Sequence, residues 1–325
     1  MALESEVAKE LSITLTCGEQ SENHVGMQKQ GAGLAKEGLT EQELQDARKR
    51  LLEHGCEQVE VRELLCSQYV NKRGYFLHAP DGVNAVLRAG CTKLGVSLDF
   101  LNGRPCTHQA LLEEQAGLEW NTQYFDVKKK KVLQKRARHN LCYAETRVEP
   151  DLERGQGTVY SFSEVPVTDV YRAGLGVIFG EKLSGCQMEG NRYDNVGKQG
   201  IGVHGDQERK IVVGARLGAS HALGFAWFKH GEYLRMVGEP FMFTLSGGSL
   251  YAMSEKTTGW DFKNAHVTGC HLRHAAGAPG YINFHAYVES NKKRRLASKK
   301  YRAACCSAST VETPASSCGN QRYAK

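Results

Sequence analysis

Apolar positions recur with helical spacing between residues 39 and 119. Thr40 and Glu43 form a capping-box pattern that predicts the start of one helix, and Gly55 is placed to end it. Three more helices are predicted at residues 59–70, 83–94 and 111–118. We therefore expect a helical region over residues 39–119 that packs against the rest of the chain.

From about residue 120 the pattern changes to short apolar runs separated by glycines. These runs predict extended segments at residues 158–162, 211–217, 225–228, 241–245, 249–253 and 281–288. One helix is predicted among them, at residues 165–179. Many short strands with glycine turns are typical of a sandwich or a jelly roll. The expected fold class is therefore α+β and mainly β, with a core domain over residues 120–290.

The two ends of the chain differ from this core in composition. Residues 1–38 are polar and contain several glycines, which predicts a flexible leader. Residues 291–325 begin with basic residues and continue rich in Ser, Ala and Cys, which predicts a mobile tail. The start of the chain lacks the basic and apolar segments of a secretory signal, and no apolar run approaches membrane-spanning length.

Cysteine usage indicates an intracellular protein. The chain of 325 residues has 11 cysteines but no C-x-x-C pair, which argues against a zinc ribbon. Since a secretory signal is not expected either, reduced thiols are the simplest interpretation. We expect a cytoplasmic or nuclear protein without membrane contact, and the sequence does not indicate its oligomeric state.

The net charge of +6 is concentrated in two basic clusters, at residues 128–138 and 292–302. Lys and Arg side chains at this density can contact the phosphates of DNA or RNA. The second cluster could also serve as a nuclear address. The alternative for both clusters is solvated surface charge, because blocks of like charge are usually exposed.

The most specific chemical signal is His204-Gly205-Asp206. Residues two apart on an extended strand point to the same side, so His204 and Asp206 could hold adjacent positions of one metal ion. This pair would form the first half of the 2-His-1-carboxylate triad of non-haem Fe(II) oxygenases. Because H-x-D alone occurs by chance in many chains, its surroundings decide its meaning.

Those surroundings carry a resemblance. Asn191-x-Tyr193, a glycine-containing turn and Ile201-Gly202-Val203 precede His204, and an Ile/Val-rich strand at 211–218 follows it. This arrangement resembles the core of the AlkB family of 2-oxoglutarate- and Fe(II)-dependent dioxygenases, over roughly residues 120–290. The resemblance implies a double-stranded β-helix, or jelly roll. It also implies bound Fe(II), with 2-oxoglutarate and O2 as co-substrates.

The resemblance further implies roles for individual side chains. His204 and Asp206 would be metal ligands at the catalytic centre. Asn191 and Tyr193 would donate hydrogen bonds to 2-oxoglutarate. Arg273, in the segment that resembles the family's closing strand, would pair with the distal carboxylate through its planar fork. Glu208 would be a neighbouring acid that faces the substrate.

The second histidine of the triad has three candidates, which are His266, His271 and His274. In a regular strand His271 shares the face of Arg273, whereas His274 points to the opposite face. We favour His274, which completes the triad at 274 − 204 = 70 residues from His204. If Arg273 also contacts the site, the strand must bulge or end at this point.

The function expected first is hydroxylation and demethylation of alkylated nucleic-acid bases, with oxidative decarboxylation of 2-oxoglutarate driving the attack on a C–H bond. Two alternatives stay open at the sequence level. One is a dioxygenase of the same fold that acts on protein or on a small molecule, because a fold does not determine a substrate. The other is a non-catalytic jelly-roll binding protein that lacks a complete iron site.

Overall fold

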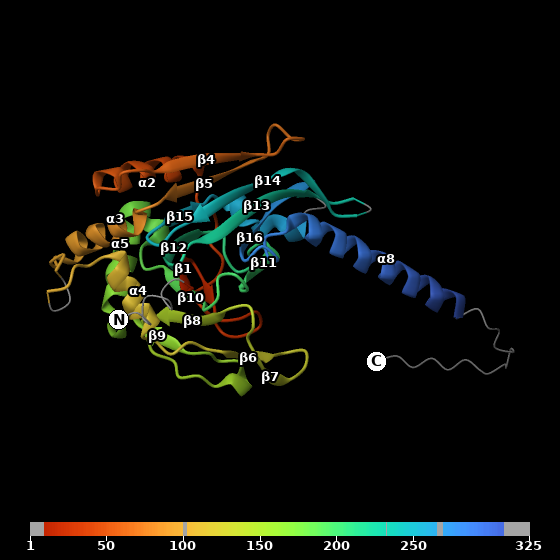
Figure 1. Ribbon diagram of the computed structural model, residues 1–325, viewed down its shortest axis with the longest axis horizontal. Helices are drawn as coiled ribbons and strands as arrows, with labels where there is room; N and C mark the ends of the chain where they lie inside the picture. Colours follow the sequence, from red (N-terminus) through yellow and green to blue (C-terminus); the bar gives the residue numbers. More distant parts are fainter. Residues whose placement is uncertain (1–9, 100–102, 232, 265–268, 309–325) are drawn as a thin grey trace, which may run out of the picture.

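The computed structural model describes residues 10–99, 103–231, 233–264 and 269–308. Its centre consists of two β-sheets that face one another (Figure 1). The larger sheet has the strand order β4-β5-β15-β12-β1-β10-β8-β9, and all neighbours are antiparallel except the parallel pair β8 and β9. The smaller sheet is antiparallel, in the order β11-β16-β13-β14.

The strands of the larger sheet are β1 (Ser12–Gly18), β4 (Glu60–Leu65), β5 (Arg73–Ala79), β8 (His139–Ala144), β9 (Val159–Ser161), β10 (Gln187–Tyr193), β12 (Val212–Gly218) and β15 (Leu250–Met253). Those of the smaller sheet are β11 (Gly200–His204), β13 (His221–Lys229), β14 (Arg235–Leu245) and β16 (Cys270–Gly277). Two short hairpins lie outside both sheets, β2 (Ser21–Glu22) with β3 (Lys29–Gln30) and β6 (Gln123–Asp126) with β7 (Lys131–Gln134). The α-helices are α2 (Glu41–Glu53), α3 (Gly82–Leu94), α4 (His108–Ala116), α5 (Pro166–Phe179), α6 (Glu255–Thr258) and α8 (Phe284–Ala308).

Helices cover the outer face of each sheet. Side chains of α2, α3, α4 and α5 form the largest apolar core with one face of the larger sheet. A second core, which includes Phe76, Phe225 and Trp227, lies between the sheets. The start of α8 packs on the outer face of the smaller sheet through Phe284 and Phe228. The mixed, mainly β fold class is thus as predicted, and no helix in the described part of the chain is long and apolar enough to cross a membrane.

The described part of the supposed flexible leader is an integral part of the fold, so that prediction is wrong for residues 10–38. Strand β1 lies in the middle of the larger sheet, between β10 and β12. Ile13 and Leu15 point into the helix-covered core, while Thr14 and Thr16 point toward the space between the sheets. Because one face of β1 is polar but not solvent-exposed, its sequence resembles that of a surface segment.

The region 39–119 is only partly helical and is not separate from the core. The predicted helices at 83–94 and 111–118, and the capping box of Thr40 and Glu43 that begins α2, are confirmed. The predicted helix at 59–70 is wrong, because β4 forms there and pairs with β5 at the edge of the larger sheet. Both strands therefore extend a sheet whose other members come from residues 12–18 and 139–253.

The C-terminal part differs from the prediction in a similar way. The extended segment predicted at 281–288 is wrong, because α8 begins at Phe284. Phe284, Tyr287 and Val288 are spaced three and four residues apart, which places them on one helix face against the smaller sheet. The basic cluster 292–302 lies within this helix, so the prediction of a mobile tail is wrong for its described part. The remaining strands predicted in the core, and the helix at 165–179, are confirmed.

A close crossing of α3 and α5 gives the first testable prediction. A Cβ atom at Gly174 would overlap the carbonyl oxygen of Val86, which belongs to backbone that cannot rotate away. We expect Gly174→Ala to lower the free energy of unfolding by at least about 2 kcal/mol, as in other overpacked cores. Urea unfolding would measure it. Gly117→Ala is the matched control, because its nearest neighbours lie 3.5 Å away, and an equal loss in both variants would contradict the prediction.

Candidate metal centre

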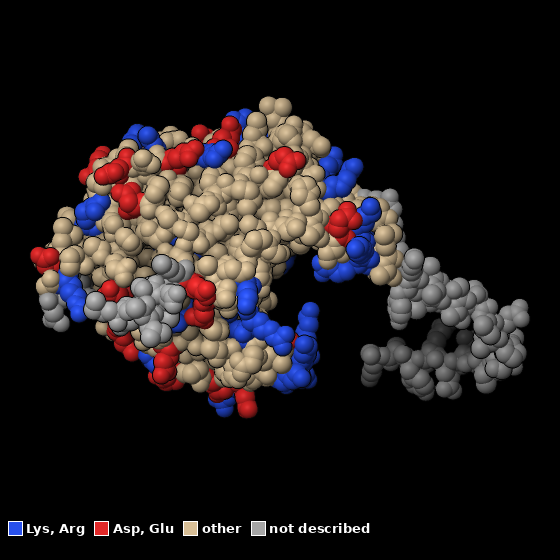
Figure 2. All heavy atoms as spheres, viewed as in Figure 1, with Lys and Arg blue, Asp and Glu red and all other residues tan. Residues whose placement is uncertain are grey.

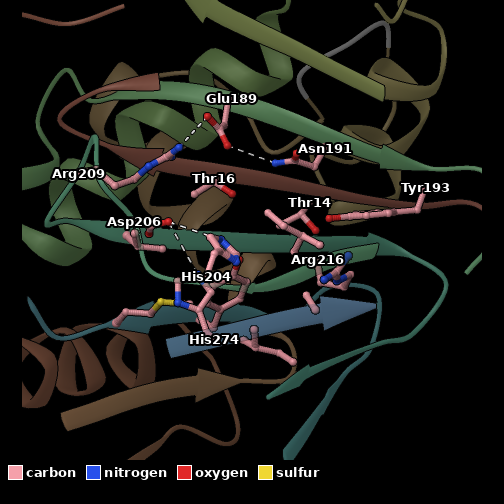
Figure 3. A pocket seen from close by; sticks show the side chains of 16 residues that line it. Thr14, Thr16, Glu189, Asn191, Tyr193, His204, Asp206, Arg209, Arg216 and His274 are labelled. Carbon is pink, nitrogen blue, oxygen red and sulfur yellow. Dashed lines mark hydrogen bonds and ion pairs between the residues drawn. The ribbon is translucent and has the colours of Figure 1, made fainter. Parts of the chain in front are cut away.

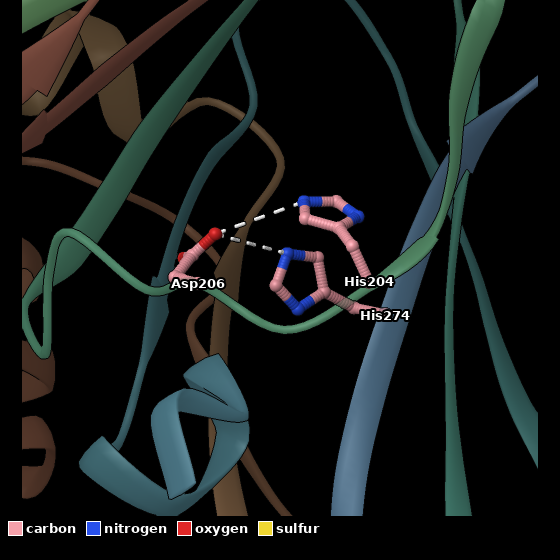
Figure 4. Close-up of side chains that lie close together, drawn as sticks. All are labelled: His204, Asp206 and His274. Carbon is pink, nitrogen blue, oxygen red and sulfur yellow. Dashed lines mark ion pairs between the residues drawn. The ribbon is translucent and has the colours of Figure 1, made fainter. Parts of the chain in front are cut away.

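Three side chains converge between the two sheets (Figure 4). His204 ends β11, Asp206 follows two residues later, and His274 lies on β16. The Nε2 atoms of His204 and His274 lie 3.7 and 3.8 Å from Oδ1 of Asp206. One ligand atom from each of the three residues lies within 4.8 Å of the others. The structure therefore brings together the triad for which His274 was the favoured second histidine.

Local backbone features produce this convergence. His204 and His274 are directly opposite on neighbouring antiparallel strands, so their side chains share a face. A bulge in β11 between Ile201 and His204 sets this register. At Gly205 a Cβ atom would overlap the carbonyl oxygen of Gly259, so only glycine fits beside that backbone. The chain then turns Asp206 inward, and its N–H donates to the carbonyl oxygen of Thr258 at 3.0 Å.

Burial keeps both histidines of this cluster in the neutral form that can bind a metal ion. Burial lowers the pKa of His204 to about 4 and that of His274 well below its ordinary value, so both rings are neutral near pH 7. Burial raises the pKa of Asp206 well above its ordinary value, although Arg209 acts in the opposite direction. Nδ1 of His204 lies 2.7 Å from the carbonyl oxygen of Gly202 and can donate to it, which leaves the Nε2 lone pair for a ligand.

These residues fit a divalent metal ion. Two ligand atoms that each lie about 2.1 Å from one ion can be at most roughly 4.2 Å apart, and both Nε2–Oδ1 distances are shorter than that. Two neutral imidazoles and one carboxylate suit Fe(II) and related first-row ions, and three protein ligands leave positions open. A bound ion would also compensate the buried carboxylate of Asp206.

A narrow inner chamber extends from the triad along β1, β10 and β12 (Figure 3). Thr14, Thr16, Asn191, Tyr193 and Arg216 line its walls. Asn191 and Tyr193 thus lie on one strand, β10, and line the chamber beside the candidate metal centre. The sequence had indicated this arrangement for both residues. The Asn191 amide is oriented by its neighbours, since its Oδ1 accepts from Arg138 Nε at 2.6 Å and from Asn140 Nδ2 at 2.7 Å.

Arg216 is the most informative residue of the inner chamber. It is 1% exposed, burial lowers its pKa, and no ion pair joins it to a carboxylate among the described residues. Its Nη1 donates to Ser12 Oγ at 3.1 Å and lies 3.3 Å from His221 Nδ1, whereas its Nε has no hydrogen-bond partner. A buried, unpaired guanidinium is costly, so this residue is suited to bind an anion.

Arg273, which was expected to pair with the distal carboxylate of 2-oxoglutarate, does not line this chamber and is not brought together with the triad. Its Nε donates to His271 Nε2 at 3.0 Å, its Nη1 donates to the Tyr287 hydroxyl, and its guanidinium lies over the Phe262 ring. Strand alternation is the reason, because His274 faces inward and its neighbour must then face α8. His271 shares that outer face, and His266 lies outside the described residues.

A larger outer chamber of about 330 Å³ adjoins the other side of the triad. The loop after β11 forms one wall of this chamber, and the segment around β2 and β3 forms another. The side chain of Arg138 also lines it. Glu208, which was expected to face the substrate, lines this chamber. Although burial acts to raise its pKa, the Arg209 guanidinium 3.0 Å away lowers the pKa of Glu208 to about 2.

Several residues of the site were missed at the sequence level, namely Thr14, Thr16, Arg138, Arg209 and Arg216. Arg209 is fully buried and pairs with Glu189 at 2.7 Å as well as with Glu208. Arg216 carried a usable signal, because it is the charged residue of an otherwise apolar and small strand, Val212–Gly218. Such a residue needs a specific buried partner.

Comparison with known proteins assigns the chain to a group without assigning an activity. No family model matches the sequence. An uncharacterized protein of Acanthamoeba polyphaga mimivirus, designated R156, is 33% identical over 275 residues, which cover 83% of this chain and 97% of the viral protein. Similarity of this extent over nearly the whole viral protein indicates common descent. The chain therefore belongs to the same family as the mimivirus protein R156.

Proposed function

We propose that this protein is an Fe(II)- and 2-oxoglutarate-dependent dioxygenase that resembles the AlkB family. The observation that carries the proposal is the His204–Asp206–His274 cluster beside a chamber with a buried, unpaired Arg216. A co-substrate that chelates a metal through one end and carries a carboxylate at the other would use both features. Arg216 takes the role that the sequence had suggested for Arg273.

The fold supports this proposal through its strand order. From β10 to β16 the chain passes back and forth between the sheets, with β10, β12 and β15 in the larger one and the other four in the smaller one. The position between β10 and β12 is occupied by β1, from the N-terminal part of the chain. We interpret this core as a double-stranded β-helix whose last strand comes from the start of the sequence.

The inner chamber favours a ligand with two anionic groups. Arg209 Nη1 and Arg216 Nε are both buried without a hydrogen-bond partner among the described residues. The two arginines lie on opposite sides of the chamber, with Thr14 and Thr16 between them (Figure 3). A dicarboxylate such as 2-oxoglutarate would satisfy a guanidinium at each end, and charge-assisted pairs of this kind are strong.

With Fe(II) bound, the site would supply oxidative decarboxylation of 2-oxoglutarate coupled to hydroxylation of a C–H bond. The protein's own contribution is to hold and orient. His204, Asp206 and His274 would fix the ion, and Arg216 would fix the far end of the co-substrate. The inner chamber is narrow, and the outer chamber leaves room for the substrate beside His204.

We further propose alkylated DNA or RNA bases as substrates, with hydroxylation of an N-alkyl carbon leading to its release as an aldehyde. Figure 2 shows Lys and Arg side chains on both sides of a notch between the β6–β7 hairpin and α8. Residues 128–131 and 292–295, all Lys or Arg, are exposed on these two elements. Such surfaces attract phosphates. Dioxygenation of protein or of a small molecule is the alternative within the same mechanism.

A titration tests the proposed function directly. Adding Fe(II) and 2-oxoglutarate to the full chain without oxygen should produce a weak visible charge-transfer absorption, and His204→Ala should abolish it. With oxygen present, methylated oligonucleotides should stimulate formaldehyde release. If wild-type protein neither takes up Fe(II) nor develops the absorption, it is instead a binding protein without an iron site.

A further inference from the structure

The outer chamber contains a cation whose function the candidate metal centre does not explain. Arg138 is half-buried and lines this chamber together with His204 and Asp206. Its Nε donates to Asn191 Oδ1 at 2.6 Å. Within the described part of the chain, its terminal atoms Nη1 and Nη2 form no hydrogen bond and no ion pair. The Arg138 guanidinium is thus fixed through Nε, while Nη1 and Nη2 can donate hydrogen bonds to a ligand.

Acidic side chains also line this chamber, and Arg209 pairs with two of them, Glu189 and Glu208. Glu208 pairs with Arg209, and the Glu22 backbone N–H donates to a Glu189 carboxylate oxygen at 3.1 Å. The Glu22 carboxylate accepts from the backbone N–H of Gly26 at 3.1 Å. Charges of both signs therefore line one chamber, because Lys29 and Arg209 line it with Arg138 and the acids. A ligand must match this polarity to bind well.

The outer chamber offers few aromatic rings on which a ligand could stack. Among the residues that line the outer chamber, His24 supplies the only ring besides the candidate ligand His204. One face of the His24 ring is already covered by Tyr124, at a centroid distance of 3.8 Å. A ligand would therefore gain more from a charged contact with Arg138 than from aromatic rings on both of its faces.

We propose that Arg138 binds an anionic group of the substrate, a phosphate or a carboxylate, and thereby places the neighbouring C–H bond beside the metal. The proposal rests on the proposed function for its oxidative step, but the anion site can be tested without turnover. Arg138 also orients Asn191, which lines the inner chamber. Asn140 donates to the same Asn191 oxygen at 2.7 Å, so Asn191 keeps one of its two partners when Arg138 is replaced.

The test uses the metal-free full chain and calorimetric titration with inorganic phosphate, with acetate and with 2-oxoglutarate. Arg138→Gln should raise the Kd for phosphate or for acetate at least tenfold, while 2-oxoglutarate binding changes by less than threefold. Arg216→Gln should do the reverse. If only phosphate affinity depends on Arg138, the substrate group is a phosphate, and if only acetate affinity does, it is a carboxylate. Lys129→Gln, on the exposed β6–β7 hairpin, controls for general attraction of anions.

The inference is overturned if neither anion responds to Arg138→Gln, or if Lys129→Gln weakens binding as much. Arg138→Lys adds a check on folding, because it keeps the charge and should retain part of the anion affinity while losing the fork geometry. Failure of the proposed function is distinguishable. A wild type without the Fe(II)–2-oxoglutarate absorption refutes the dioxygenase, whereas an Arg138→Gln enzyme with unchanged KM for its substrate refutes only this site.

Discussion

Replacing His274 with Ala should weaken Fe(II) binding by more than about 100-fold. Mutating residues that merely support a metal ligand commonly costs 10- to 100-fold in affinity, and His274 would be a ligand itself. Its Nε2 lies 3.8 Å from the Asp206 carboxylate, and removing the imidazole leaves one histidine and one acid. Anaerobic titration followed by metal analysis would measure the loss, and the charge-transfer absorption should disappear with it.

His271→Ala provides the matched control for this experiment. His271 lies three residues earlier on β16 and is fully buried, but it faces Arg273 and α8 rather than the triad. Both substitutions remove the same buried ring from the same strand, so they should cost similar amounts of folding stability. Only His274→Ala should change metal affinity. Equal Fe(II) binding in the two variants would exclude His274 as a ligand.

The part of the site that could be predicted lies on neighbouring segments of the sequence. Asn191, Tyr193, His204 and Asp206 come from β10, from β11 and from the loop after β11, within 16 residues of one another. Local spacing and strand alternation are enough to place such residues on one wall. His274 was a weaker prediction, because its approach to His204 depends on the pairing of β11 with β16.

The N-terminal strand could not be predicted because its signal depends on a tertiary contact. Strand alternation is visible in Ser12-Ile13-Thr14-Leu15-Thr16, but polar residues usually mean a solvent-exposed face. Here that face lines the inner chamber, and Thr14 Oγ1 is buried without a partner. A polar lining that serves a ligand therefore looks, in the sequence, like a polar surface. Only the position of β1 between β10 and β12 distinguishes the two.

The exchange of Arg273 for Arg216 has a related cause. Arg273 was selected because its segment resembles the closing strand of the AlkB family, yet it adjoins His274, and adjacent strand residues face opposite sides. Arg216 lies on β12, where it pairs with Thr14 of β1, a strand that the prediction had placed in a flexible leader. The sequence alone could therefore not place Arg216 beside the triad, because that requires the positions of β1, β10 and β12 in the larger sheet.

Replacing Arg216 with Gln should change ligand binding and stability in opposite directions. Truncating one partner of a buried charge pair typically costs about 2 to 5 kcal/mol, so the Kd for 2-oxoglutarate should rise by about 30-fold or more. Without ligand, however, the wild-type guanidinium is buried and unpaired, and burial lowers its pKa. The ligand-free variant should therefore be at least as stable as the wild type.

Weaker 2-oxoglutarate binding combined with unchanged or higher stability of the ligand-free protein would distinguish a binding role of Arg216 from a structural one. Thermal unfolding with and without 2-oxoglutarate would measure both, because a ligand that binds only the folded state raises the melting temperature. The wild type should be stabilised by 2-oxoglutarate and the Arg216→Gln protein should not. Arg273→Gln, on the outer face of β16, should keep the full ligand-induced shift. If Arg216→Gln instead lowers the stability of the ligand-free protein and retains the shift, the guanidinium supports the core and the co-substrate carboxylate binds elsewhere.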